Sequence, residues 1–276
     1  MTEIKPLLEK IIKDSDKAAK TFKRNLIKEQ LHILVLDFLY ARPDYSDLVF
    51  YGDSALRHCF GLDRLSEDLD FVDLTGKVDL TNLGKDLEDY FYKETDLKPK
   101  VIVQPSRVKL KFPILQELNL SDPSEYQSLL IKIEVFKHFD YCSGYKINIS
   151  TIFKLNRSVI VKTFDLSTMM ATKIAAVLHR KWLKMAKSGE ILAKVKGRDY
   201  FDLVWYLNKG IKPNLQCVMD FDSSANLKQE LLRMIERVDA KSIKFDLEPL
   251  IENSSFVENF GNNIKAILKT EIENRL

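Results

Sequence analysis

The stretch 48–74 constrains the fold of this chain more than any other. It opens with an apolar run, Leu48–Tyr51, which predicts a short buried strand. Gly52 then allows a tight backbone turn, because glycine has no Cβ atom. Ser54 stands where a helix would begin and would be its N-cap, and residues 55–60 suit two helical turns. Because the N–H groups at a helix start bind anions, this segment predicts a phosphate-binding turn.

A second strand follows the turn, over Asp68–Val72. Side chains alternate between the two faces of a strand, so Asp68 and Asp70 point the same way. Two adjacent carboxylates repel each other, and a divalent cation such as Mg²⁺ removes that repulsion. A phosphate turn beside a carboxylate pair suits metal-assisted phosphoryl or nucleotidyl transfer. The alternative interpretation is an exposed face of an edge strand.

These residues carry a resemblance to a known family. Gly52-x-Ser54 followed by Asp68-x-Asp70 is similar to the signature of the DNA polymerase β nucleotidyltransferase superfamily. The fuller string, Gly-x-Ser-Ala-Leu-Arg, then Gly, then Arg-x-Ser-x-Asp-Leu-Asp-Phe, resembles the AbiEii/AbiGii toxin family of bacterial toxin–antitoxin and phage-defence systems. One position departs from the family: Asp53 replaces a small residue, and its carboxylate would have to point away from a bound triphosphate.

The resemblance implies roles for the side chains in this string. It implies an NTP as substrate, Mg²⁺ or Mn²⁺ as cofactor, and catalytic, metal-binding roles for Asp68 and Asp70. Nucleotide binding is expected of residues in and after the turn: Gly52, Ser54, Arg57, Arg64 and Ser66.

A later strand offers a third acid. Residues 129–136 are rich in β-branched side chains and predict a strand, on which Glu134 shares a face with Lys132. The family resemblance implies a third carboxylate beside the aspartate pair, and Glu134 is the candidate metal ligand. The alternative is that Glu134 and Lys132 form a solvated strand face.

A helix with Ser167 as its N-cap carries Lys173 beside an apolar stripe. A buried lysine is costly unless paired, so composition alone favours a surface lysine with its ammonium group in water. The resemblance implies the opposite, since the toxins carry a lysine on this helix that contacts the phosphates. Lys173 is therefore a candidate catalytic and nucleotide-binding residue.

Another helix opens at Arg198-Asp199-x-x-Asp202. Acids in a first helical turn also stabilise the helix dipole, which is a purely structural explanation. The string resembles the last AbiEii motif, which implies a catalytic role for Asp199, a structural one for Asp202 and phosphate binding by Arg198. The resemblance covers residues 48–210.

Residues 179–198 hold seven Lys or Arg and one acid, with Trp182 available for stacking. This composition suits a nucleic-acid backbone. It suits an acidic partner protein equally well, and a merely solvated loop is the third interpretation.

Periodicity predicts the remaining elements. The chain should contain two helices within residues 4–42, with His32 in the core, and an amphipathic helix over 79–94. Alternation predicts strands within 98–112 and 138–166, and a helical tail over 210–276. A polar loop is expected at 121–124.

Composition limits the remaining choices. Net charge is +3, from 43 basic and 40 acidic side chains, so total charge predicts nothing about nucleic acid. Cys59, Cys142 and Cys217 are odd in number and far apart, which predicts reduced thiols in a cytoplasmic protein. No apolar run has membrane-spanning length.

We therefore expect an α/β (α+β) protein whose mixed, nucleotidyltransferase-like sheet is flanked by helices. Residues 1–166 would form this domain, and residues 167–276 a helical C-terminal domain that completes the active site in a cleft between them. The resemblance implies a toxin with a cognate antitoxin that transfers NMP from an NTP, with tRNA 3′ ends as a plausible acceptor. The alternatives are transfer to a protein or small molecule, or an inactive nucleotide-binding module.

Overall fold

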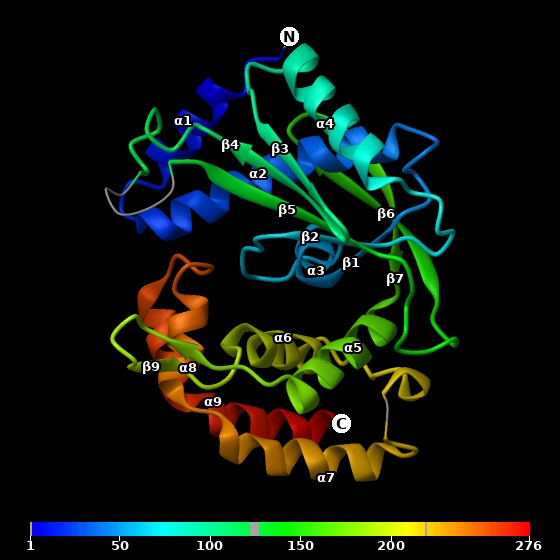
Figure 1. Cartoon of the computed structure of the whole chain (residues 1–276). Coiled ribbons are helices and arrows are strands. Elements are labelled where there is room, and N and C mark those ends of the chain that lie inside the picture. The colour runs from blue at the N-terminus through cyan, green and yellow to red at the C-terminus, as the bar shows by residue number, and fades with distance from the viewer. Residues whose placement is uncertain (1, 122–126, 219) are drawn as a thin grey trace. The chain divides into compact units, whose positions relative to one another are not determined.

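A seven-stranded mixed sheet organises the first half of the computed structural model, which describes residues 2–121, 127–218 and 220–276 (Figure 1). The strand order is β3-β4-β5-β2-β1-β7-β6. The chain divides into two compact units, residues 1–139 with 147–163, and residues 140–146 with 164–276. The strands are β1 (Val49–Tyr51), β2 (Leu69–Val72), β3 (Lys100–Gln104), β4 (Arg107–Phe112), β5 (Leu129–Phe136), β6 (Ile147–Lys154) and β7 (Arg157–Phe164).

The pairing of β2 decides where its acids lie. It runs antiparallel to β1 on one side and parallel to β5 on the other. In this register Asp70 lies opposite Tyr51 on β1 and opposite Glu134 on β5. The predicted mixed sheet is confirmed, and the strand with the Asp-x-Asp pair is near its centre.

One face of the sheet is apolar and packs against helices α2 (Lys20–Tyr40), α3 (Gly52–Phe60) and α4 (Leu80–Glu94). Phe50 and Phe71 stack on this face with ring centroids 5.2 Å apart. Phe91 of α4 approaches Phe112 of β4 edge-on at 5.0 Å. Because side chains alternate along each strand, the charged residues of β2, β4 and β5 point to the other face.

Two buried histidines lie among these helices. His32 of α2 is fully buried, as predicted, and its ring approaches His58 of α3 edge-on at 5.7 Å. Burial disfavours a positive charge, so the pKa of His32 falls to about 3 and that of His58 falls well below its ordinary value.

The second unit is mainly helical. A two-stranded sheet, β8 (Lys184–Met185) with β9 (Ile191–Ala193), forms within the basic segment 179–198. The helical elements elsewhere in the chain are α1 (Lys5–Asp14), α5 (Leu166–His179), α6 (Gly197–Asn208), η1 (Leu215–Cys217), α7 (Ser224–Met234), η2 (Ile235–Arg237), α8 (Ala240–Leu247) and α9 (Ser254–Arg275). All of them except α1 belong to this unit.

Two predicted helix caps are wrong. Helix α3 begins at Gly52, with Tyr51 as its N-cap, so Ser54 lies inside the first turn. Helix α5 is capped by Asp165, which accepts a hydrogen bond from the Thr168 N–H at 3.1 Å, and not by Ser167. The Ser54 hydroxyl group bonds to the start of β2 instead, and at α5 the aspartate takes the capping position.

The expectation of three reduced thiols is also wrong. Cys142 and Cys217 form a disulfide within the second unit, and Cys59 stays a free thiol. The two half-cystines are separated by 75 residues, so their spacing carried no signal. Burial raises the pKa of the Cys59 thiol to about 12.

Within the described ranges, helices that combine membrane-spanning length with sufficient apolar character are absent. The expected polar loop at 121–124 falls mostly outside the described residues.

Candidate active site

Three carboxylates lie together on the polar face of the sheet, at strands β2 and β5. Asp70 and Glu134 occupy the same register position on parallel strands β2 and β5. Asp68 lies two residues before Asp70, just ahead of β2, and its ion pair with Lys132 of β5 places it on the same face. The adjacency that the family resemblance implied for Glu134 is therefore observed, and its role as a ligand stays a prediction.

Two cations partly neutralise these acids. The Lys132 ammonium group lies 3.0 Å from Asp68 Oδ2, and the Arg107 guanidinium lies 3.0 Å from Glu134 Oε1. No described residue donates a hydrogen bond to the other carboxylate oxygen of either acid, Asp68 Oδ1 or Glu134 Oε2. Oxygen donors thus remain available beside Asp70, as a hard divalent cation requires.

The backbone passes very close to Asp70 at Gly52. Gly52 has φ of +76°, a left-handed conformation that glycine adopts without strain. A Cβ atom built there would lie 2.6 Å from Asp70 Oδ2. Both the backbone conformation and the lack of room for a Cβ atom therefore require glycine at this position. The turn can approach the carboxylate pair this closely only because the residue is glycine.

Ser54 and Ser66 connect the turn to β2. The Ser54 hydroxyl group lies 2.8 Å from the Ser66 hydroxyl group and also contacts the Asp68 carbonyl oxygen. Ser54 is fully buried, so its side chain holds the start of α3 against the beginning of β2. Sequence reasoning had assigned Ser54 to nucleotide binding and had not foreseen this bracing contact.

The departure at Asp53 has a structural partner. The Arg64 guanidinium lies 2.7 Å from Asp53 Oδ2 and donates to the Leu65 carbonyl oxygen at 3.0 Å. The Arg64 side chain is fully buried, so this cation offsets the additional acid of the turn. Arg64 was expected to bind nucleotide, and here it contacts an acid of the turn itself.

Arg57 lies on α3 with partners away from the carboxylates. Its Nε donates to Glu29 Oε1 of α2 at 2.8 Å, and its Nη1 donates to the Leu62 carbonyl oxygen at 2.8 Å. Its expected contact with nucleotide stays a prediction.

The second unit gathers its predicted residues around Lys173. The ammonium group donates to Asp199 Oδ1 at 3.0 Å and lies 2.7 Å from Asp202 Oδ2. Lys173 is 9% exposed, so the surface position favoured by composition is wrong. The two acids are one helical turn apart on α6 and face α5 together, which is what a buried ammonium group needs.

Asp199 also accepts a hydrogen bond from Arg180 Nη1 at 2.6 Å. In the sequence Arg180 is only one of the cations of the basic segment, because a separation of 19 residues from Asp199 gives no periodic signal. The backbone N–H of Arg198 donates to Asp246 Oδ2 at 3.0 Å, which anchors the start of α6 to α8.

The basic segment 179–198 is largely exposed. Trp182 is 36% exposed, and the Lys196 ammonium group lies 5.4 Å from the centre of its ring. Leu183 and Met185 are exposed as well, at 58% and 55%. The segment therefore presents cations beside an accessible aromatic ring.

Comparisons with known proteins found one matching family and several similar structures. The family model described as "Nucleotidyl transferase AbiEii toxin, Type IV TA system" matches residues 35–268. The structure of MenT4, a nucleotidyltransferase toxin from Mycobacterium tuberculosis H37Rv, superposes with a TM-score of 0.56 at 11% identity, covering 96% of this chain and 88% of that chain. JHP933 from Helicobacter pylori gives a TM-score of 0.47 at 15% identity, covering 90% and 92%. No curated protein sequence matches significantly.

Proposed function

This chain belongs to the AbiEii nucleotidyltransferase toxin family, and we propose that it transfers a nucleoside monophosphate from an NTP to the 3′ end of tRNA with the help of Mg²⁺ or Mn²⁺. The observation that carries the proposal is the register of Asp70 and Glu134 on neighbouring strands, with Asp68 beside them. Such a cluster is costly in a protein that has no cation to bind there.

The donor set suits a divalent metal ion. Asp68, Asp70 and Glu134 are hard oxygen ligands, and Asp68 and Glu134 each keep one oxygen without a described hydrogen bond. A cation held by these acids would supply Lewis-acid stabilisation of the charge that develops on the phosphate oxygens.

The chain's own residues position the triphosphate. The N–H groups in the first turn of α3 have no acceptors within the helix and favour a negative charge nearby. They are therefore proposed to donate hydrogen bonds to the phosphate oxygens. Gly52 lets this turn approach Asp70 closely. The contact between Ser54 and Ser66 holds the turn in place against β2. It thereby fixes the distance between the N–H groups of the turn and the carboxylates.

Lys132 and Arg107 already face the carboxylates. Each forms an ion pair at 3.0 Å with one of the three acids. Cations at this edge of the cluster would also attract the anionic nucleotide, since favourable charge interactions steer association.

We extend the proposal to residues 167–276, as the domain that completes the active site. Lys173 would exchange one of its carboxylate partners for a phosphate oxygen. Asp199 would then orient the acceptor or the nucleotide, with Arg198 binding phosphate and Asp202 keeping the local structure. The buried ion pairs of Lys173 support a functional role for its charge, because buried ion pairs seldom add stability by themselves.

A cytoplasmic location, a role in phage defence and a cognate antitoxin follow from the family as further proposals. Transfer to a protein or small molecule is the alternative activity, and an inactive nucleotide-binding module is the alternative class.

One experiment separates these functions. The protein is incubated with each α-labelled NTP, Mg²⁺ and bulk tRNA, and the products are separated by size and by nuclease or protease digestion. Label that disappears on nuclease digestion supports the proposal. If the labelled product resists nuclease but is digested by protease, the label is on a protein and tRNA is rejected as the acceptor. Absence of any Mg-NTP binding by calorimetry, with the chain folded, would reject the enzyme itself.

A further inference from the structure

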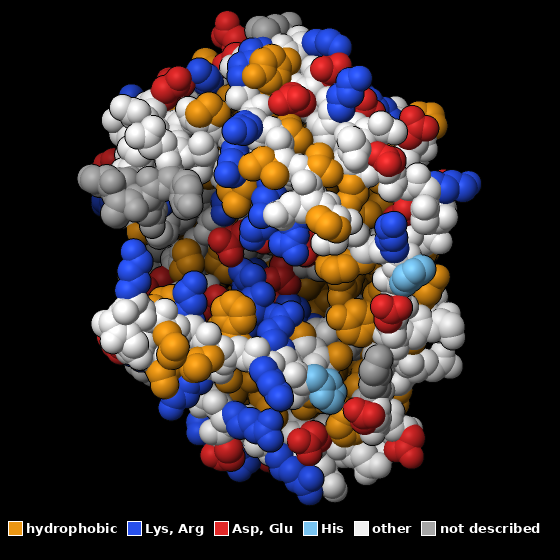
Figure 2. Space-filling model, viewed as in Figure 1, with side chains coloured by type: hydrophobic (Ala, Val, Ile, Leu, Met, Phe, Trp, Pro, Cys, Tyr) orange, Lys and Arg blue, Asp and Glu red, His pale blue; other side chains and the backbone are white. Residues whose placement is uncertain are grey.

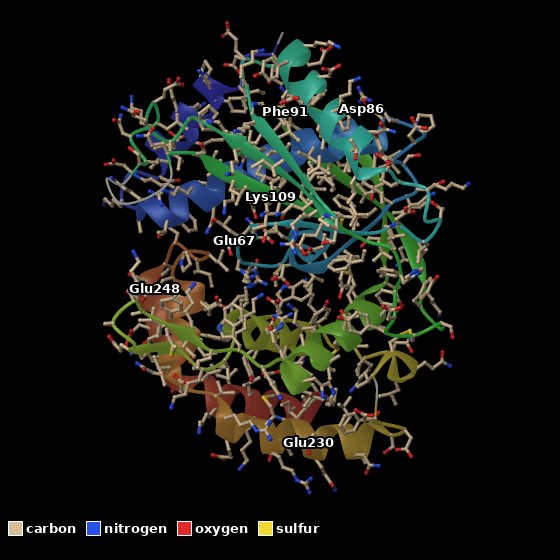
Figure 3. All side chains as sticks on the ribbon, viewed as in Figure 1. Glu67, Asp86, Phe91, Lys109, Glu230 and Glu248 are labelled. Carbon is tan, nitrogen blue, oxygen red and sulfur yellow. A yellow bond between two sulfur atoms is a disulfide. The ribbon has the colours of Figure 1, made fainter. Side chains whose placement is uncertain are left out.

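The polar face of the sheet continues past the three carboxylates as a surface of cations on β3, β4 and β5. We call this the basic sheet face, and it consists of Lys100, Arg107, Lys109, Lys111 and Lys132. Lys and Arg side chains gather along these strands in Figure 2, and Figure 3 labels Lys109 over the sheet. All five lie within the first unit and outside the basic segment noted in the sequence.

The register places like charges directly opposite each other. Lys100 on β3 lies opposite Lys111 on β4, and Lys109 on β4 lies opposite Lys132 on β5. Opposite charges at facing positions stabilise an antiparallel pair, whereas like charges destabilise it. Two Lys–Lys pairs side by side are therefore unfavourable for the isolated sheet, and a bound anion would reverse their effect.

Neighbouring acids cancel only part of this charge. Lys132 is paired with Asp68 and Arg107 with Glu134, so these two cations belong to the carboxylate cluster. For Lys100 and Lys109, the described parts of the chain provide no ion-pair partner. Positive charge thus remains at the outer strands, where an external anion can reach it.

The arrangement is extended and not point-like. Arg107, Lys109 and Lys111 recur at every second residue of β4, which spaces them about 6.7 Å apart along the strand. A repeat of this length is comparable to that of successive phosphates in an extended single strand. Phe136 lies on the same face of β5 as Glu134, next to the carboxylates, and it is 42% exposed. A base could therefore stack on its ring.

We propose that the basic sheet face binds the sugar–phosphate backbone of a single-stranded RNA segment and directs its end toward Asp70 and Glu134. The inference rests on the proposed nucleotidyl transfer and names the surface that the acceptor uses. On this inference the acceptor RNA binds to strands β3–β5 and not to residues 179–198.

The test compares two triple variants by fluorescence anisotropy with a 5′-labelled single-stranded oligoribonucleotide. One variant is Lys100→Gln, Lys109→Gln and Lys111→Gln. Its control is Lys10→Gln, Lys13→Gln and Lys17→Gln, which removes the same charge from exposed positions on or just after α1. Melting temperature checks both folds, and the sheet-face variant should melt no lower than the native protein, since it loses facing like charges.

For the sheet-face variant, RNA affinity should fall about ten- to a hundred-fold at 0.1 M salt, and the slope of log K against log salt should shrink by about 0.7 per lost contact. The control should stay within about twofold of the native affinity, because its lysines lie away from the sheet. Equal affinity of the sheet-face and control variants would overturn the inference. So would displacement of the RNA by polyglutamate of equal charge at equal concentration, because the surface would then recognise negative charge alone.

Two further measurements separate this inference from the proposed activity: the binding of Mg-NTP to the native protein by calorimetry, and RNA binding and transfer by the Asp70→Asn variant. Asp70→Asn should keep RNA binding and lose transfer. If the native protein binds RNA through the sheet face but transfers nothing, the inference stands and the proposed function fails. If transfer to RNA occurs and the sheet-face variant transfers with an unchanged KM for RNA, the inference fails and the function stands.

Discussion

Asp70 and Glu134 face each other across the parallel strands β2 and β5, where Arg107 pairs with Glu134 and Lys132 with Asp68. We expect Asp70→Asn to lower nucleotide transfer by about a hundred- to a thousand-fold, because an amide is a poor ligand and cannot balance a cation. The same variant should lose the rise in melting temperature that Mg²⁺ produces in the native protein. Its melting temperature without metal should stay equal or increase, since one of two neighbouring charges is gone.

Asp63 supplies the matched control for this substitution. It is an exposed acid in the same connection between α3 and β2. Asp63→Asn should change neither transfer nor the response to Mg²⁺. Full activity in Asp70→Asn would contradict the assignment of the carboxylate cluster.

Gly52 and Gly61 allow steric and conformational effects to be separated. Both have positive φ, +76° and +74°, so alanine at either position costs about 1–2 kcal/mol of backbone strain. Only at Gly52 would the new Cβ meet Asp70 Oδ2, at 2.6 Å, whereas Gly61 has open space. We expect Gly52→Ala to lose transfer at least tenfold more than Gly61→Ala at similar stability. Equal activity in the two variants would refute a role for the close approach.

The buried charges of the second unit predict a large stability effect. Lys173→Met leaves Asp199 and Asp202 buried without their shared ammonium group, which should lower the free energy of unfolding by about 3–5 kcal/mol. Adding Asp202→Asn should recover part of that loss. Urea unfolding can follow this unit selectively, because the two tryptophans, Trp182 and Trp205, both belong to it. A loss below about 1 kcal/mol would mean that water already solvates these charges.

The histidine pair predicts acid sensitivity of the first unit. His32 has a pKa near 6.5 when unfolded and about 3 when folded. Between these values the unfolded chain binds the additional proton, so stability is complete above about pH 6.5 and falls as the pH decreases. For His32 alone the loss should reach about 2 kcal/mol at pH 5. His58, whose pKa is also lowered, adds to the effect in the same direction.

The measurement is urea unfolding at pH 7 and pH 5, followed by circular dichroism. His32→Asn should flatten the pH dependence, whereas His138→Asn, at an exposed position of the same unit, should not. A native protein equally stable at both pH values would exclude neutral, buried histidines.

Local patterns were sufficient for the strand with the Asp-x-Asp pair and for the glycine turn, because alternation and glycine geometry act within a few residues. They were insufficient for the partners of these residues. Lys132 and Asp68 are 64 residues apart, and Lys173 and Asp199 are 26 apart. Their contacts depend on which strands and helices become neighbours, and composition had placed Lys173 on the surface.

Long-range pairing also explains what the sequence did not reveal. The bond between Cys142 and Cys217 and the Lys–Lys rows across β3, β4 and β5 arise only once the chain is folded. The cap predicted at Ser54 failed for a related reason, because its hydroxyl group bonds to the start of β2 instead.

That serine contact and the ion pair between Arg64 and Asp53 together join α3, the following connection and β2. Two independent side-chain contacts across so short a segment oppose bending within it. We therefore expect the segment to meet an incoming substrate as one unit, with little rearrangement of its own.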